Sequence, residues 1–310
     1  MWRYTAKRLL QGVITVWFIA TVTFFAMHSV PGDPLSEARG VTPEIRANLE
    51  ARYGLDRPLM AQYGLFLGNM LRGDFGISFT QQNRQVNDII REHFPVSATL
   101  GILAIVFAAA GGILWGALTA LYRNRLPDVV IMFLVILGIS VPSFVFAGLG
   151  QLALVNLNML AGRTILPVAG WGTVAHMLVP ALVLGLSTMA YLTRLMRSSM
   201  LEVISADYIR TARAKGVPPG RIFTRHQLRN AVLPVVTVLG PAIAAITTGG
   251  FVVELVFAIP GLGRYFVQAV QQLDYTVIMG TTVFYGAFLV FMVILVDLLY
   301  GWIDPRVRLQ

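Results

Sequence analysis

The segment that decides how this chain folds runs from Met196 to Pro234 and reads MRSSMLEVISADYIRTARAKGVPPGRIFTRHQLRNAVLP. It holds seven Arg or Lys residues against two acids, Glu202 and Asp207, and it lies between two long apolar runs. Basic connections between membrane spans are retained on the cytosolic side. The sequence therefore predicts a membrane protein that presents this segment to the cytosol.

The composition supports a membrane protein. Of the 310 residues, 56% are apolar and 13% are charged, whereas soluble domains average about 25% charged residues. The chain has no cysteine, which excludes structural disulfides, thiolate metal sites and thiol catalysis. The net charge of +9 arises mostly beside the apolar runs. It therefore indicates membrane topology and contact with the lipid bilayer, and no nucleic-acid partner is expected.

Six apolar runs are long enough to cross a bilayer as helices, which takes about 20 residues. They are Leu9–Val30, Ala98–Tyr122, Val129–Val155, Ala175–Leu195, Ala231–Phe257 and Thr276–Tyr300. The first run has 22 residues and lacks a small-x-small cleavage site, so we interpret it as a retained span. Fifteen basic residues fall on the side shared by both termini and nine on the other side. This asymmetry predicts that both termini are cytosolic.

The predicted fold is all-α, with six transmembrane helices in three regions. Residues 1–30 hold the N-terminus and first span, residues 31–97 form an external subdomain, and residues 98–310 form a five-helix core. The core includes a cytosolic loop at residues 196–230. Within the external subdomain, Pro43–Tyr53 and Met60–Leu71 have helical apolar spacing, and Thr42 is expected to cap the first of these helices.

The cytosolic loop contains a short helix with clear start and stop signals. Ser205 is expected to cap its N-terminus, with Asp207 at the positive end of the helix dipole. Gly216 suits the position after the last turn, and Pro218-Pro219 prevent continuation. Tyr208, Ala212 and Lys215 share one face of this helix. Such a helix, spanning Ser205–Lys215, is suited to docking into the groove of a partner.

Several strings in the chain resemble the membrane permeases of ABC importers. Ala212, Gly216 and Leu233-Pro234 match their EAA motif, although Arg210 and Thr211 stand where the general motif has Glu-Ala. The strings DYIRTARAKG at 207–216 and HQLRNAVLPVVT at 226–237 resemble the peptide/nickel branch of this family. The resemblance covers nearly the whole chain and includes PGDP at 31–34, GDFG at 73–76 and PGLG at 260–263. The string from Val86 to Ser97 is most similar to the oligopeptide permeases.

This resemblance implies the type I ABC importer permease fold and one half of a path for oligopeptides. The implied partners are a second homologous permease, two cytosolic P-loop ATPase subunits and an extracytoplasmic peptide-binding protein. ATP and Mg²⁺ would lie on the ATPase subunits, with no cofactor on this chain, and the localisation would be the bacterial inner membrane. The residues implied to couple to the ATPase are Asp207, Tyr208, Arg210, Thr211, Ala212, Arg213, Ala214, Lys215 and Gly216. A dipeptide, nickel, glutathione or oligosaccharide substrate remains open.

Two residues within the spans are candidates for the translocation path or the subunit interface. Pro142 interrupts the third span, either to bend helices around a cavity or for packing alone. Glu254 lies near the outer end of the fifth span, where intramembrane carboxylates are often functional. It either lines the path or pairs across a subunit interface, or it lies at the membrane interface and caps or snorkels.

Missing motifs limit the alternatives. The sequence has no G-x-x-x-x-G-K-[ST], G-x-S-x-G or H-E-x-x-H string, so ATP hydrolysis would have to come from another subunit. The four histidines are on separate segments, so no metal site is expected. A stand-alone secondary transporter would need inverted repeats and coupling-ion carboxylates, and a membrane enzyme would need a nucleophile–base set. Neither pattern is evident, so a transport subunit without its own ATP site is the favoured interpretation.

Overall fold

The computed structural model describes residues 2–30, 44, 57–81 and 84–303, and within these ranges the chain is almost entirely helical. The only strand-like pairing among these residues is an isolated bridge between Ile77 and Gln85. The longer helices are α1 (Trp2–Ser29), α3 (Leu59–Leu71), α4 (Val86–Leu121), α5 (Leu126–Ser140), α6 (Ser143–Ala161), α7 (Val174–Ser205), α11 (Leu233–Gly249), α13 (Leu262–Gln271) and α14 (Tyr275–Ile303). The shorter ones are α8 (Asp207–Ala214), α9 (Pro219–Arg221), the π-helix η1 (Ile222–Leu228), α10 (Arg229–Ala231) and α12 (Phe251–Val256).

Six of these helical segments are long and apolar enough to cross a membrane, as the sequence predicts. They are Thr5–Ser29, Val86–Leu121, Ser143–Ala161, Val174–Ser205, Leu233–Val256 and Tyr275–Val296. The predicted helix Met60–Leu71 is confirmed as α3. The predicted helix Pro43–Tyr53 and its cap Thr42 lie outside the described residues.

The predicted third span, Val129–Val155, is interrupted at Pro142, as the sequence predicts. It is divided into α5 and α6 by Val141 and Pro142, whose ψ angles of 126° and 144° are extended. Proline has no N–H to donate to Gly138, and its ring disfavours a helical conformation at Val141. The apolar run continues through this point, so the proline, and not the apolar character of the run, predicts the break.

Two further spans extend beyond their apolar runs. Helix α4 begins at Val86, before the predicted Ala98, and α7 continues to Ser205. The added first turns of α4 are amphipathic, and Val86, Ile89 and Ile90 are buried in a cluster with residues of α13 and α14. Packing of one face therefore sustains helical turns that contain too many polar residues to be recognised as part of a span.

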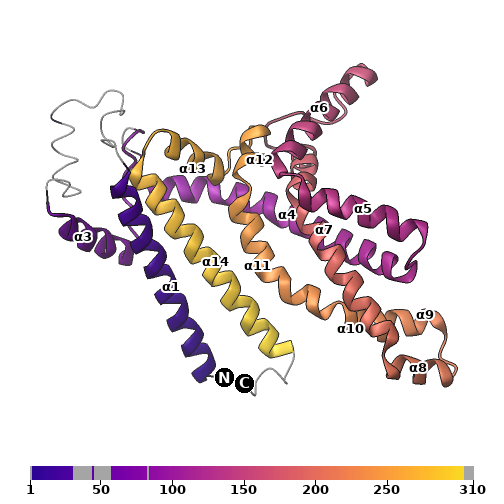
Figure 1. Cartoon of the computed structure of the whole chain (residues 1–310). Helices are drawn as coiled ribbons and strands as arrows, with labels where there is room; N and C mark the ends of the chain where they lie inside the picture. Colours follow the sequence, from indigo (N-terminus) through magenta and orange to yellow (C-terminus); the bar gives the residue numbers. More distant parts are fainter. Residues whose placement is uncertain (1, 31–43, 45–56, 82–83, 304–310) are drawn as a thin grey trace. The chain divides into compact units, whose positions relative to one another are not determined.

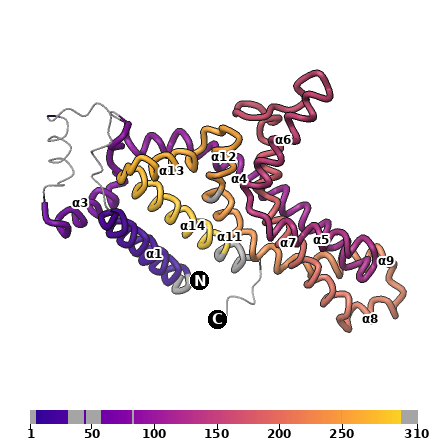
Figure 2. The backbone as a smooth tube through the Cα atoms, turned by 45° about the horizontal axis from the view of Figure 1, so that its top comes forward, coloured from indigo at the N-terminus to yellow at the C-terminus, as the bar shows by residue number. Residues whose placement is uncertain are grey.

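The described chain divides into two compact units: residues 1–97 with 260–310, and residues 98–259. In the first unit, α1 runs along α14, as both views show (Figures 1 and 2). Asp274, which is 1% exposed, precedes α14. Its carboxylate accepts hydrogen bonds from the hydroxyls of Ser78, Thr80 and Thr276. This buried acid ties the segment before α4 to the start of α14.

In the second unit, α7 is the central helix and packs against α5, α6 and α11. It also approaches α4 closely, because Gly112 and Gly116 lie one turn apart on the facing side of α4. A Cβ atom at Gly116 would lie 2.5 Å from the Met196 Cβ, and one at Gly112 would lie 2.6 Å from the Leu192 Cβ. Small residues at this spacing allow two membrane helices to pack at short range. Beyond α7, the chain turns into the short elements α8, α9 and η1 (Figure 1).

Candidate functional site

The basic loop folds as a short helix, α8, directly after α7. Helix α8 begins at Asp207 and is preceded by Ala206, which has an extended ψ of 145°. The prediction that Ser205 caps this helix is wrong. Ser205 is the last residue of α7, and its hydroxyl donates to the Glu202 carbonyl at 2.8 Å. A serine at the end of a helix readily donates a hydrogen bond to a carbonyl of the preceding turn. Because the Ser205 hydroxyl makes this bond, it does not cap α8.

The C-terminal end of α8 agrees with the sequence prediction. Gly216 adopts a left-handed φ of +74°, a conformation that favours glycine because it has no Cβ. The Gly216 N–H donates to the Arg213 carbonyl at 2.9 Å, and the Val217 N–H donates to the Ala212 carbonyl at 3.2 Å. These two bonds form a Schellman motif, which satisfies carbonyls at the end of a helix. The helix is therefore closed at this end by a defined structure.

The faces of α8 differ sharply in burial. Ile209 is fully buried, and Ala212, one turn later on the same side, is half-buried. Ala212 is the one predicted coupling residue that is not fully exposed, and its role in docking stays a prediction. The other predicted coupling residues are exposed, namely Asp207, Tyr208, Arg210, Thr211, Arg213, Ala214, Lys215 and Gly216. Ile209 was not identified from the sequence, although it is the one large apolar side chain in an otherwise polar helix.

Helix α8 is also fixed to the chain that follows it. The Asn230 side chain donates from Nδ2 to the Tyr208 hydroxyl at 3.0 Å and to the His226 carbonyl at 2.9 Å. The chain between Tyr208 and Asn230 includes η1, a π-helix of seven residues in which Ile222 and Gln227 are buried. The pair of Arg210 and Asp207 at 3.4 Å is highly exposed, and such surface pairs contribute little to stability. The position of α8 thus depends mainly on Ile209, Asn230 and the C-terminal motif.

A hollow of about 750 Å³ opens beside α8 and η1. Its walls combine residues of the segment 213–227 with the end of α4 and the end of α7. The residues that line it are Ala120, Leu121, Ile204, Arg213, Val217, Pro219, Gly220, Ile222, Phe223 and Gln227. An exposed helix with basic side chains therefore lies beside this hollow, and the helix has a shape that a partner protein can engage.

The two candidates within the spans have different surroundings. Pro142 is exposed and begins the segment that leads into α6. Glu254 lies in α12 and is only 2% exposed, with its N–H donating to the Gly250 carbonyl at 2.9 Å. A side chain that snorkels to the membrane surface would be exposed, so the burial of Glu254 disfavours that alternative. A role of either residue in the translocation path or the subunit interface stays a prediction.

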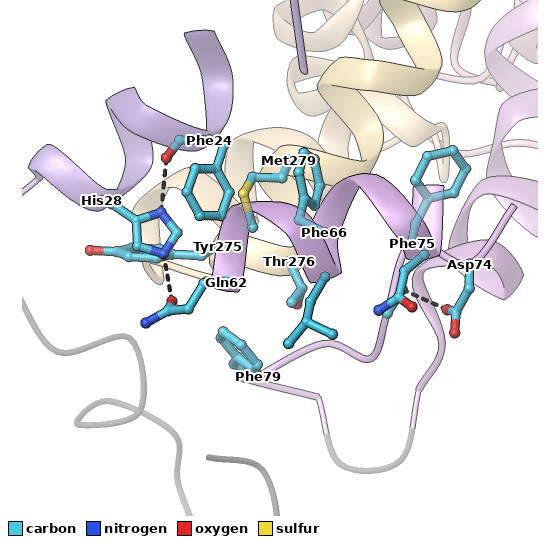
Figure 3. A pocket seen from close by; sticks show the side chains of 13 residues that line it. Phe24, His28, Gln62, Phe66, Asp74, Phe75, Phe79, Tyr275, Thr276 and Met279 are labelled. Carbon is cyan, nitrogen blue, oxygen red and sulfur yellow. Dashed lines mark hydrogen bonds between the residues drawn. The ribbon is translucent and has the colours of Figure 1, made fainter. Parts of the chain in front are cut away.

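A small pocket of about 60 Å³ lies in the first unit, where α3 meets α1 and α14 (Figure 3). His28 stands at its edge, with Nδ1 at 2.8 Å from the Phe24 carbonyl and Nε2 at 3.2 Å from the Gln62 amide oxygen. Phe24 also stacks on Phe66 of α3. These contacts hold α3, the described helix of the predicted external subdomain, against the end of α1. Within the described residues, no group of three or more His, Asp or Glu side chains is arranged to hold a metal.

Comparison with known proteins gives the family of this chain. Residues 112–309 match the model of the binding-protein-dependent transport system inner membrane component. Residues 1–101 match the model of the N-terminal region of the same membrane component. The chain belongs to this family of transport-system inner membrane components.

Full-length relatives support this assignment. The inner membrane component described here is 47% identical to the dipeptide transport system permease protein DppB of Bacillus subtilis, over 100% of this chain and 99% of the relative. It is 42% identical to the oligopeptide transport system permease protein OppB of Haemophilus influenzae, over 99% of this chain and 100% of the relative. It is 39% identical to OppB of Escherichia coli K12 over the same shares of the two chains.

One solved structure shows the same fold at low sequence identity. It is the crystal structure of an amino acid ABC transporter with histidines, which superposes with a TM-score of 0.53 at 15% identity. The superposition covers 68% of this inner membrane component and 92% of the solved chain. This likeness confirms the predicted permease fold of ABC importers and carries no information about the substrate.

Proposed function

We propose that this chain is the permease subunit of an ATP-driven importer of oligopeptides and forms one half of the translocation path. Its family and its full-length relatives, which are named as dipeptide and oligopeptide permeases, support a peptide substrate. The preference for oligopeptides over dipeptides rests on the string from Val86 to Ser97. The other half of the path would come from a second homologous permease, and an extracytoplasmic binding protein would deliver the peptide.

The observation that carries the coupling role is the structure of α8. An ATPase acts on a path that it does not line, so the connection needs a rigid element that moves as a body. The buried Ile209 and the Schellman motif at Gly216 give α8 that rigidity. The exposed Arg210, Arg213 and Lys215 would set the register and specificity of docking through charge complementarity. We therefore assign α8 as the site at which two cytosolic P-loop ATPases, carrying ATP and Mg²⁺, act on this permease and its partner.

This assignment includes a topology. Helix α8 must face the cytosol, which places both termini there and residues 31–97 on the outer side of the inner membrane. The basic residues are distributed in agreement with this orientation.

Reconstitution tests the proposal. The chain is purified with its partner permease, ATPases and binding protein, and uptake of labelled dipeptides and of longer peptides is measured in proteoliposomes. We expect uptake that requires ATP and both the ATPases and the binding protein, with longer peptides preferred. Uptake by this chain without any ATPase would refute the function, whereas uptake of dipeptides alone would refute only the oligopeptide preference.

A further inference from the structure

A buried ion pair joins α5 to α7 near the end of α7 that leads into α8. The guanidinium of Arg197 donates from Nε to Asp128 Oδ1 and from Nη2 to Asp128 Oδ2, both at 2.8 Å. The Asn124 N–H donates to the same Oδ2 at 2.9 Å, from a residue with a left-handed φ of +62°. The Asp128 side chain is 5% exposed and that of Arg197 is 24% exposed. Three donors therefore converge on one buried carboxylate.

This geometry fixes both distance and orientation. Two parallel N–H···O bonds from one guanidinium hold the planes of the two groups together, and lysine cannot reproduce them. Removal of either partner leaves the other charge buried without compensation. The pair is thus a stiff link between two helices, made by residues that are 69 positions apart in sequence.

The remaining contact between α5 and α7 is uneven. Near the C-terminal end of α5, Gly138 approaches α7 so closely that a Cβ atom there would lie 3.0 Å from the Ala190 Cβ. An apolar cavity of about 280 Å³ lies beside this contact and is lined by residues of α5 and α7, such as Leu134 and Met189, and by Trp115 of α4 and Phe146 of α6. A cavity removes dispersion contacts from its walls. The ion pair therefore provides a polar, directional attachment of α5 to α7. The apolar packing of the two helices is incomplete beside the cavity.

The position of the pair connects two features of the molecule. Arg197 lies about two helical turns before the end of α7, after which the chain enters α8. Asp128 lies in the first turn of α5, which ends at the break formed by Val141 and Pro142. A displacement of the end of α7 would thus be passed to α5 through the pair, and from α5 to the break in the third span.

We propose that Asp128 and Arg197 are positioning residues for transport, which transmit movement of α8 and α7 into α5. This inference rests on the proposed function, because it requires an ATPase that displaces α8. In this scheme the pair keeps the inner ends of α5 and α7 together as one body throughout the ATP cycle. Without the pair, the ATPase would still dock on α8 and hydrolyse ATP, but less of the movement would reach the third span.

The first test measures peptide imported per ATP hydrolysed in the complete reconstituted complex. Asp128→Asn and Arg197→Gln are each expected to lower this ratio about tenfold, within the usual range of coupling between linked sites. The double variant should be no worse than either single variant, because each change removes the same link. Arg194→Gln is the matched control: it removes the same charge from an exposed position one turn earlier on α7, where Arg194 has no ion-pair partner among the described residues. It should keep the wild-type ratio.

The second test measures the link directly. The chain has no cysteine, so spin labels at Leu126→Cys on α5 and Ser198→Cys on α7, both exposed positions, report one distance across the pair. In the wild-type background this distance should stay the same when ATP binds and when the complex is trapped after hydrolysis. With Asp128→Asn added, the distance distribution should broaden. If that variant does not reach the membrane, Arg197→Lys, which keeps the charge and loses the paired geometry, replaces it with the same expectation.

A wild-type distance that changes during the ATP cycle would overturn the proposal. Unchanged peptide-to-ATP ratios in both single variants would also overturn it, and so would losses that multiply in the double variant. Failure of the proposed function is recognised separately, because the wild-type complex would then show no ATP-dependent uptake at all.

Discussion

Gly216 gives the sharpest test of α8 as the coupling element. Replacing it with valine places a β-branched residue at a φ of +74°, which costs about 1–2 kcal/mol in the left-handed region. A Cβ atom at Gly216 would meet nothing within 4 Å in this chain, so the Cβ itself adds no clash to that cost. At about 2 kcal/mol, the equilibrium constant between the intact and the frayed helix end falls by a factor of about 30. The added side chain also projects from the exposed surface that we assign to the ATPase.

Two variants separate these effects. Gly220→Val makes the same change four residues later, where the added Cβ is equally free of contacts but φ is not positive. It should change stability by less than about 0.5 kcal/mol. Gly216→Asn introduces a side chain that tolerates the left-handed region, so it tests crowding at the docking surface without most of the backbone strain.

The assay is co-purification of the ATPase subunits with the permease from membranes, combined with ATP-dependent peptide uptake. We expect Gly216→Val to be present in the membrane at normal levels, and to lose either the ATPase or its coupling to transport. Gly220→Val should behave as wild type. Full retention of the ATPase with wild-type uptake by Gly216→Val would refute the assignment of this loop.

Three further predictions concern named contacts. Ile209→Ala should release α8 from the second unit at a cost of about 2–5 kcal/mol of local packing, seen as faster amide hydrogen exchange in residues 207–216. Tyr208→Phe removes the hydrogen bond from Asn230 and should cost about 1 kcal/mol, with uptake lowered less than in Ile209→Ala; an equal loss would show that the buried isoleucine is not the main anchor. Asp274→Asn places an amide group, which donates hydrogen bonds, against the donors of Ser78 and Thr80 at a buried site. It should destabilise the chain by about 1–3 kcal/mol, measured as a lower melting temperature in detergent. An unchanged melting temperature would contradict the role given to Asp274.

Local patterns in the sequence are sufficient for much of this protein. The six membrane-crossing segments follow from runs of apolar residues, because the cost of placing polar groups in hydrocarbon acts on each segment separately. The end of α8 follows from glycine and two prolines, whose backbone preferences act within a few residues. The basic character of the segment after α7 is likewise read directly from its residues. These features depend on interactions between neighbours in the chain.

Other features depend on pairs that are far apart in sequence, and only the tertiary structure decides them. Asp128 meets Arg197 across 69 residues, and Ser78 meets Asp274 across 196. Helix α4 starts at Val86 because its amphipathic first turns have a surface to pack against, and Ile209 is an anchor because a buried site exists beneath α8. The free energy of such contacts comes from desolvation and mutual orientation of groups that the folded chain brings together. No local sequence pattern shows which distant residues will meet. The positions of most helices therefore follow from the nearby sequence, whereas the contacts between helices are decided by the tertiary structure.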